Sequence, residues 1–430
     1  MGALARRGHD QLRNGLWSFG HTLRDLRRQA RPGVVPNRVL HVTSSFDLGG
    51  TQTQLKHLVT APTTRFEHRV TEIFPELNYL FRQDERVERE RYVQGDWLRR
   101  ALGGVVVRRS PRGFDLVQVA KIVRDLEIEQ PATVVGWGHE ICVTTFLAAA
   151  IARIPRVVFC IRTFNPEYGW TDAKRARRLQ IAHRRMAPRA HAVVVNSTLL
   201  QHDYGEWTGI DSRRIAVCSN GTSLDVPPPS EMAAYRARTR SAWGVADDGI
   251  VVSNVGRFSK EKGQDLLIRA NAFLPADVGA RVTFVLCGDG PTLADVKALA
   301  ESAATTNVRF VGRTTSVWEL LAASDIFVMP SDYEGMPNAM MEAMAAGLPC
   351  VSTTRSGIRD IARDGVEALY FEVGDSSGLA RHLQHLVANP QIASMLGRSA
   401  VQRIGQFTVA RLVECFEQAI APIEPPAPQH

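Results

Sequence analysis

The chain has 430 residues, of which 44% are hydrophobic and 22% are charged, and its formal net charge is +8. This length exceeds one ordinary core and fits two domains of about 200 residues each. The composition excludes a disordered chain and is typical of a globular protein. The positive charge suits anionic lipid, a sugar nucleotide or nucleic acid equally well, so charge alone does not select a partner.

Residues 1–36 are predicted to form a basic N-terminal arm. Seven arginines within residues 1–31 alternate with leucines and aromatic residues, and no apolar core of signal-peptide length is present there. Such an arm can lie on an anionic membrane surface, and the alternative is a solvated arm. The longest apolar run, Ile141–Ile151, is too short to span a bilayer. We expect a cytoplasmic protein that can bind peripherally to the inner face of the membrane.

The six cysteines include no close pair and no spacing typical of a metal site. Cys160, Cys218 and Cys287 stand in apolar, strand-like runs. We therefore expect these three to be reduced core residues, as in a cytoplasmic protein.

The first domain is predicted over residues 37–230, where short β-branched runs alternate with helical patterns. This rhythm is typical of parallel strands joined by crossover helices. The highly charged segment 76–100 interrupts it and reads as an exposed insertion without an assigned role. The expected strands are Arg38–Thr43, His68–Phe74, Gly104–Arg108, Thr133–Gly136, Arg156–Ile161, Ala192–Val195 and Arg214–Cys218.

The second domain is predicted over residues 231–430, after a change of composition at Asp225–Ala242 that reads as a linker between domains. The same alternation then restarts, which predicts a second doubly wound α/β domain. Closing helices and a Pro-rich tail end the chain. The expected strands are Gly249–Val255, Arg281–Cys287, Val308–Val311, Asp325–Met329 and Cys350–Ser352.

A helix is predicted from Pro337 to Ala346, since Pro suits the first turn and Gly-Leu-Pro ends the pattern. Its side chains are almost all apolar, so the carboxylate of Glu342 should be buried and needs a partner. Glu334 stands eight residues earlier, in a loop where free backbone N–H groups favour anions. Two carboxylates beside an anion site suggest a ligand with phosphate and hydroxyl groups. Alternatively, Glu342 pairs with an arginine and Glu334 is only a helix-start acid.

Three further loops follow predicted strands, where doubly wound sheets bind their ligands. Arg257 and Lys262 supply cations at a position suited to a phosphate. Gly49 and Gly50 follow the first strand and let the backbone approach a diphosphate closely. The GDGP segment, residues 288–291, reads as a tight turn before a helix.

The order of these segments is more specific than any one of them. A Gly-Gly loop, GRFSKEKG, GDGP, VGR and EGMPNAMMEAMAAGLP follow one another in a pattern that resembles glycosyltransferase family 4 of the GT-B superfamily, over about residues 38–400. The resemblance implies a GT-B fold, in which two Rossmann-like domains face a central cleft. It also implies a retaining transferase that moves a sugar from a nucleotide diphosphate to a glycan or lipid-linked acceptor, as in polysaccharide biosynthesis.

The resemblance also implies roles for individual residues. Glu342 matches the glutamate that holds the ribose hydroxyls, and Glu334 matches the one that contacts the transferred sugar. Arg257 and Lys262 match the pair that neutralises the diphosphate. The donor would further be lined by the backbone of Gly49, Gly50, Gly335, Met336, Pro337 and Asn338.

On the acceptor side the chain departs from the family pattern. Many members carry a histidine after a strand of the first domain, whereas here that strand is followed by Arg162 and Asn165. His139, after the preceding strand, is the other candidate, and the alternative is that it is a loop residue or makes a helix-entry hydrogen bond. Asn220-Gly221 matches a turn that commonly ends the first domain of such enzymes, and we interpret it as structural.

We expect no metal and no other cofactor, because the chain has no Asp-x-Asp pair and cations with a helix N-terminus can stabilise a leaving diphosphate. No nucleic-acid partner is expected. Two alternatives remain at this point: a sugar-nucleotide epimerase or phosphorylase on the same fold, and an inactive basic binding protein. No lysine stands out as a pyridoxal phosphate site, and a binding module would not require the full set of two cations and two glutamates.

Overall fold

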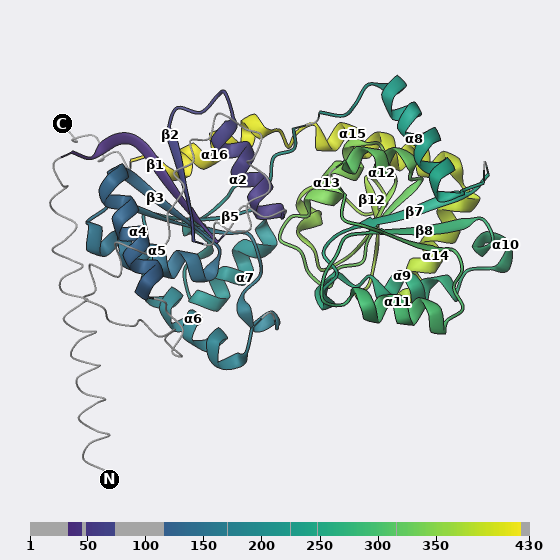
Figure 1. The fold of residues 1–430 in the computed structure, drawn as a ribbon, viewed down its shortest axis with the longest axis horizontal. Helices are drawn as coiled ribbons and strands as arrows, with labels where there is room; N and C mark the ends of the chain where they lie inside the picture. The colour runs from purple at the N-terminus through teal and green to yellow at the C-terminus, as the bar shows by residue number, and fades with distance from the viewer. Residues whose placement is uncertain are drawn as a thin grey trace, which may run out of the picture. The chain divides into compact units, whose positions relative to one another are not determined.

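The computed structural model describes residues 33–44, 49–73, 116–169, 171–223, 225–246, 248–314 and 316–422. Most of the predicted arm, the expected strand Gly104–Arg108, the segment 76–100 and the Pro-rich tail lie outside these residues. The described residues form two compact units (Figure 1). The first contains 33–195, 203–216 and 413–422, and the second contains 196–202 and 217–412. The first unit therefore takes its last segment from the end of the chain.

The first unit is built on a parallel sheet of short apolar strands. Its strands are β1 (Val35–Thr43), β2 (Glu67–Glu72), β3 (Pro131–Trp137), β4 (Arg156–Ile161), β5 (Ala192–Val195) and β6 (Ile215–Val217). Among the described residues the strand order is β2-β1-β3-β4-β5-β6, and β1 pairs in parallel with both β2 and β3. All seven residues of β3 are buried, as expected for a strand covered on both faces.

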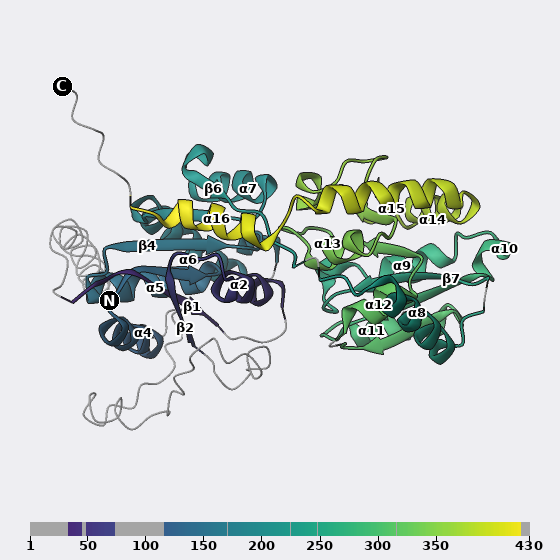
Figure 2. The ribbon, with the colours of Figure 1, turned by 90° about the horizontal axis from the view of Figure 1, so that it is seen from above.

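Helices cover both faces of this sheet. They are α2 (Gly50–Thr60), α4 (Leu116–Glu129), α5 (His139–Ala152), α6 (Ala173–Met186), α7 (Thr198–Thr208) and α16 (Val409–Ile420). On one face Leu40, Val42 and Val134 share a core with α4 and α5. On the other face the ring of His41 lies 6.0 Å from that of Phe416 on α16. Figure 2 shows α4 and α16 on opposite sides of the sheet.

A series of hydrogen bonds crosses the face beneath α16. Trp137 Nε1 donates to His41 Nδ1 at 3.0 Å, so His41 Nε2 carries the ring proton and donates to His68 Nδ1 at 2.8 Å. His68 Nε2 then donates to Thr64 Oγ1 at 2.8 Å, and this hydroxyl donates to Glu417 at 2.6 Å. Both imidazoles are held neutral, since a second ring proton would meet another donor. Burial lowers the pKa of His41 well below its usual value and that of His68 to about 4.

The second unit has a parallel sheet of its own. Its strands are β7 (Ile250–Val255), β8 (Val282–Cys287), β9 (Val308–Gly312), β10 (Ile326–Met329), β11 (Cys350–Thr353) and β12 (Ala368–Phe371). The order is β12-β11-β10-β7-β8-β9 in the described residues. The chain thus winds outward from β7 in one direction and from β10 in the other.

Helices again lie on both faces. They are α8 (Pro229–Trp243), α9 (Asp265–Asn271), α10 (Ala276–Gly279), α11 (Leu293–Ser302), α12 (Val317–Ala323), α13 (Asn338–Ala345), α14 (Ser376–Ala388) and α15 (Pro390–Ile404). One core joins Leu321 of α12 and Met340 of α13 to Val251 of β7. The other joins Leu267 of α9 and Leu383 of α14 to the opposite face. Two doubly wound parallel sheets are therefore confirmed.

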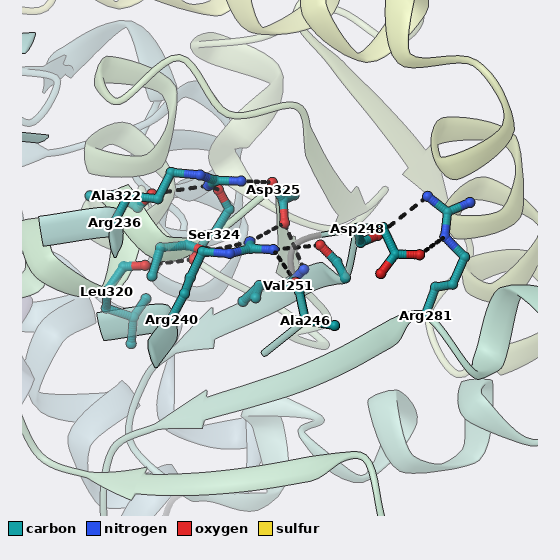
Figure 3. A network of polar contacts seen from close by, with 12 residues as sticks. Arg236, Arg240, Ala246, Asp248, Val251, Arg281, Leu320, Ala322, Ser324 and Asp325 are labelled. Carbon is teal, nitrogen blue, oxygen red and sulfur yellow. Dashed lines mark hydrogen bonds and ion pairs between the residues drawn. The ribbon is translucent and has the colours of Figure 1, made fainter. Parts of the chain in front are cut away.

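The predicted linker Asp225–Ala242 is wrong, because most of it forms α8. Figure 3 shows how this helix is held. Arg236 Nη2 and Arg240 Nη1 reach the carboxylate of Asp325 at 2.6 and 2.8 Å, and Val251 N donates to the same carboxylate at 2.7 Å. Arg240 is buried and also donates to the carbonyl oxygens of Ala323 and Gly249. The charges of this segment thus fasten a helix to the start of β10.

The predictions for the cysteines and for the strands of the second unit are only partly confirmed. Cys160 and Cys287 are free and buried, as predicted, whereas the prediction is wrong for Cys218, which is disulfide-bonded. Strand β12 was not predicted. Within the described ranges, no helix has both the length and the apolar character that a membrane crossing requires.

Candidate functional site

The second sheet changes direction between β7 and β10, and the crevice at such a point is where open α/β sheets bind ligands. Lys262 follows β7 and Glu334 follows β10, so the two loops meet at this edge. Lys262 Nζ lies 2.5 Å from Glu334 Oε1, and Ser331 Oγ donates to the same oxygen at 3.0 Å. The lysine and glutamate side chains are 25% and 14% exposed, so the pair remains open to solvent or a ligand.

The backbone fixes these two loops against each other. Asp332 N donates to Glu261 O at 2.8 Å. Gly263 has a φ of +62°, and a Cβ there would lie 2.4 Å from the carbonyl oxygen of Pro330. Only glycine therefore suits this position, and the Lys262–Glu334 pair is set on a closely packed frame.

The GDGP segment supports the same frame. Phe258 N donates to Asp289 O at 2.9 Å. Gly288 has a φ of +146°, and a Cβ on it would come within 1.8 Å of Gly256 O. This turn therefore packs directly under the loop that carries Arg257, which is more than the simple turn expected from its sequence.

Arg257 lies at the same edge but makes no pair with the glutamates. Its carbonyl oxygen accepts from Gln264 Nε2 at 3.0 Å, while its side chain is exposed. Among the described residues no carboxylate forms an ion pair with its guanidinium. The structure thus places Arg257 beside the site as an uncompensated cation.

Glu342 is carried by the second turn of α13. Met340, Met341 and Met344 bury this helix, whereas Glu342 is half-buried. No arginine or other described side chain pairs with its carboxylate, so the ion-pair alternative is not supported. Burial raises the pKa of Glu342 to about 7. A half-buried acid without a protein partner is suited to polar groups of a ligand.

The segment before α13 presents backbone rather than side-chain groups. Gly335, Met336 and Pro337 are buried. Pro337 is the N-cap residue but provides no side-chain cap, and the first turn of α13 has no acidic residue. The N–H groups at this helix start therefore face no competing carboxylate of their own turn. Asn338 is the first helical residue.

The first sheet changes direction between β1 and β3; Gly49 and Gly50 follow β1, His139 follows β3, and Arg162 and Asn165 follow the next strand, β4. Gly49 is the N-cap of α2 and Gly50 its first residue, and both are exposed. His139 begins α5, yet it is only 3% exposed and its ring packs 5.5 Å from His183 and 5.4 Å from Trp207. His139 thus packs inside the first unit, and its contact with an acceptor stays a prediction.

Arg162 and Asn165 make their contacts inside the first unit. The guanidinium of Arg162 lies 5.2 Å from the ring of Trp137, and its Nε contacts Cys160 Sγ at 3.4 Å. Asn165 Nδ2 donates to Asp203 Oδ1 at 2.8 Å, and its Oδ1 accepts from Glu167 N at 2.9 Å. Both residues are nearly buried, so their proposed contact with an acceptor remains a prediction.

Comparisons with known proteins agree with this architecture. The family model described as glycosyl transferases group 1 matches residues 236–403, and the one described as glycosyltransferase family 4 matches residues 48–226. Putative glycosyltransferase EpsF of Bacillus subtilis is 32% identical over 216 residues, which cover 48% of this chain and 53% of that protein. The lipopolysaccharide core biosynthesis glycosyltransferase LpsE of Rhizobium meliloti is 35% identical over 176 residues, covering 40% and 50%. The matches thus span about half the length of these curated relatives.

Solved structures share the fold. Anabaena Alr3699/HepE, crystallised in complex with UDP and glucose, has a TM-score of 0.71 at 21% identity, covering 89% of this chain and 98% of that one. WaaG, a glycosyltransferase involved in lipopolysaccharide biosynthesis, has a TM-score of 0.64 at 17% identity, covering 89% and 99%. Two doubly wound sheets, the charged edge of the second and both family matches lead to one conclusion: the chain belongs to glycosyltransferase family 4 and has the GT-B fold.

Proposed function

We propose that the protein is a retaining glycosyltransferase that transfers a hexose from a nucleotide diphosphate sugar to a glycan or a lipid-linked acceptor. The observation that carries this proposal is the Lys262–Glu334 pair at the point where the second sheet changes direction, with Glu342 and Arg257 at the same edge. Lys262 and the N–H groups at the start of α13 can bind a phosphate, and a glutamate can accept hydrogen bonds from hydroxyl groups. Together they fit a ligand that contains both phosphate and sugar. The complex of HepE with UDP and glucose supports this ligand class by analogy.

Each charged residue then has a role in donor binding. Lys262 and Arg257 neutralise the diphosphate, and the backbone from Gly335 to Asn338 lies along the sugar and phosphates. Glu334, released from Lys262 as the phosphate arrives, contacts the transferred sugar. Glu342 accepts from the ribose hydroxyls. The backbone of Gly49 and Gly50 is proposed to bind the donor as well.

The reaction exchanges one C–O bond for another. The bond between the anomeric carbon and the diphosphate oxygen breaks, while the acceptor oxygen bonds to the same face of that carbon. The departing diphosphate oxygen takes the acceptor's proton. Negative charge grows on the diphosphate during this step, so cations aimed at it act mainly on the transition state. We therefore propose that transfer needs no metal ion.

The acceptor side is proposed from the first unit. His139, Arg162 and Asn165 are the candidates there, and Arg162 has the only permanent positive charge of the three.

The N-terminal arm would hold the enzyme at an anionic membrane. Deleting residues 1–31 should release the protein from vesicles that contain phosphatidylglycerol while activity on a soluble acceptor persists. Equal pelleting of the truncated and complete proteins would rule out this role.

A thermal-shift panel of nucleoside diphosphates and their sugars tests the proposed donor class. A ligand at 100 times its dissociation constant should raise the free energy of unfolding by about 2.7 kcal/mol. Transfer should then be measured with the stabilising donor in EDTA. No stabilisation by any member of the panel would contradict the function, and activity that requires added Mg²⁺ or Mn²⁺ would contradict the metal-free mechanism alone.

A further inference from the structure

Asn220 of the second unit reaches the segment that leads into α13. It is 3% exposed. Its Nδ2 donates to Met336 O at 2.9 Å and to Asn338 Oδ1 at 2.7 Å, and its backbone N–H points to Met336 Sδ at 3.1 Å. One buried amide thus holds both ends of the Met336–Asn338 segment, although the turn that carries it lies 116 residues earlier in the chain.

These bonds fix the orientation of two side-chain amides. A backbone carbonyl only accepts, so the nitrogen of the Asn220 amide must face Met336. Asn338 then turns its oxygen toward Asn220, and its own Nδ2 lies on the other side of its amide group. The orientation of the Asn338 donor is therefore set by Asn220 rather than by α13.

The turn behind Asn220 is anchored as well. Thr222 N donates to Phe407 O at 2.9 Å. A Cβ on Gly221 would lie 2.8 Å from the Cα of Val409 and 3.0 Å from Thr408 O. This close packing fixes the turn that carries Asn220 within the second unit.

We propose that Asn220 is a positioning residue of the donor site. It holds Met336–Asn338 so that the first N–H groups of α13 and the amide of Asn338 face the diphosphate opposite Lys262. This inference rests on the proposed function, since the diphosphate is the ligand proposed there. It assigns to the Asn220-Gly221 turn a role beyond the structural one expected from the sequence.

The test separates the phosphate end of the ligand from the nucleoside end. Using the complete protein, affinities for UDP, GDP and ADP and for uridine, guanosine and adenosine are measured by calorimetry. Asn220→Ala should weaken binding of the diphosphate preferred by the wild type by about tenfold or more, while affinity for its nucleoside is unchanged. Asn338→Ala should show the same selective loss. The double variant should lose less than the sum of the two single losses, because the two residues share one hydrogen bond.

Asn307 provides the matched control. Its Nδ2 donates to Val282 O at 2.8 Å and to Asn271 Oδ1 at 3.1 Å, just before β9 and therefore at the opposite end of the sheet from the donor loops. Asn307→Ala should lower Tm without changing the affinity for the diphosphate relative to that for the nucleoside.

Each remaining outcome is decisive. A proportional loss of diphosphate and nucleoside affinity in Asn220→Ala would overturn the inference, and so would wild-type affinity. If Asn220→Ala does not fold, unchanged diphosphate affinity in Asn338→Ala overturns it. Failure of the wild type to bind any nucleoside diphosphate would remove the proposed function and this inference together, whereas tight binding by the wild type and both variants would remove only the inference.

Discussion

The two units place different kinds of polar group where their sheets change direction. In the second unit Lys262 and Glu334 are charged and partly exposed, and Arg257 beside them has no carboxylate partner among the described residues. In the first unit, His139 and Asn165 are at most 5% exposed and make contacts within that unit. The polar groups of the first unit are thus packed inside it, whereas the charges of the second unit lie at an edge where a ligand can reach them.

The interiors differ in the same way. Beneath α16 the first unit buries a neutral hydrogen-bonded series that includes His41 and His68. Under α8 the second unit holds a partly exposed ion-pair network of Arg236, Arg240 and Asp325, in which only Arg240 is buried. Hydrogen bonds of neutral imidazoles are lost when the rings gain a proton. Ion pairs are lost when one of the two charged partners is removed. The two units should therefore respond to different perturbations.

Acidification should have the largest effect. Burial lowers the pKa values of His68 and His183 to about 4, from 6.5. Between these values the unfolded chain binds more protons than the folded one, so stability of the first unit falls as pH falls from about 6.5 to 4. At about 1.4 kcal/mol per pKa unit, each histidine costs about 3 kcal/mol over that range. Hydrogen-exchange protection factors of β1 and β3, measured from pH 7 to 4.5, should decline.

Glu342 should give the second unit the opposite slope. Burial raises its pKa from 4.5 to about 7, so the stability contributed by its protonated form is complete below about 4.5 and is lost as pH rises through about 7. Protection of β7 and β10 should therefore increase as pH falls from 7 to 5, and Glu342→Gln should remove the increase. Parallel slopes in the two units would contradict the comparison.

Asp325→Ala should destabilise the second unit by about 3–5 kcal/mol, because it leaves buried Arg240 without its carboxylate. Urea unfolding followed by hydrogen exchange at β7 measures the loss. The control is Glu319→Ala, which removes the exposed partner of Arg238 on the same two helices and should cost no more than about 1 kcal/mol. Equal losses in the two variants would show that the ion pairs of Asp325 are not what holds α8.

Lys262→Ala should lower kcat by about 10²–10³-fold and change the KM for donor far less, since the lysine is proposed to face charge that develops in the transition state. Steady-state kinetics with the donor found by thermal shift provide the measurement. Lys260→Ala, two residues away and exposed, is the matched control and should stay close to wild type. A variant that raises KM while kcat is kept would place Lys262 in ground-state binding only.

Glu342→Ala should have the smallest effect, weakening nucleoside diphosphate binding by about 1.5–3 kcal/mol through the loss of the proposed acceptor for ribose hydroxyls. Glu334→Gln should differ: because Glu334 is proposed to contact the sugar, the variant should keep nucleoside diphosphate affinity nearly unchanged while turnover falls. Calorimetry and transfer assays on both variants separate the two roles. Losses of equal size in both assays would mean that the two glutamates are assigned the wrong way round.

Much of the architecture could be predicted because the parallel strands are short, apolar and regularly spaced. Strands β4 and β5 have the predicted bounds. The position of Lys262 and Glu334 at one sheet edge follows from the same regularity, since each residue follows a strand. Their direct contact could not be predicted, because it depends on β7 and β10 being neighbours in the sheet.

Other features lack a periodic signal. The contact between Thr64 and Glu417 joins residues 353 positions apart, and nothing local to either residue indicates it. Helix α8 did carry a signal that the Pro-rich composition concealed: Pro229 at its first turn, good helix formers within it, and Gly244 with a φ of +62° at its end. Strand β12 has only four residues, too few for an alternation to be read.

The C-terminal segment of the first unit has a consequence for synthesis of the chain. The strands of that unit are complete at Val217, but Phe416 and Glu417 emerge from the ribosome roughly 200 residues later, a delay of about 10–40 s at 5–20 residues per second. During this interval the sheet face that α16 will cover has neither the ring that packs on His41 nor the carboxylate that binds Thr64. The first unit, whose strands are translated first, is therefore completed last. Until then a chaperone at the ribosome can bind its uncovered sheet face.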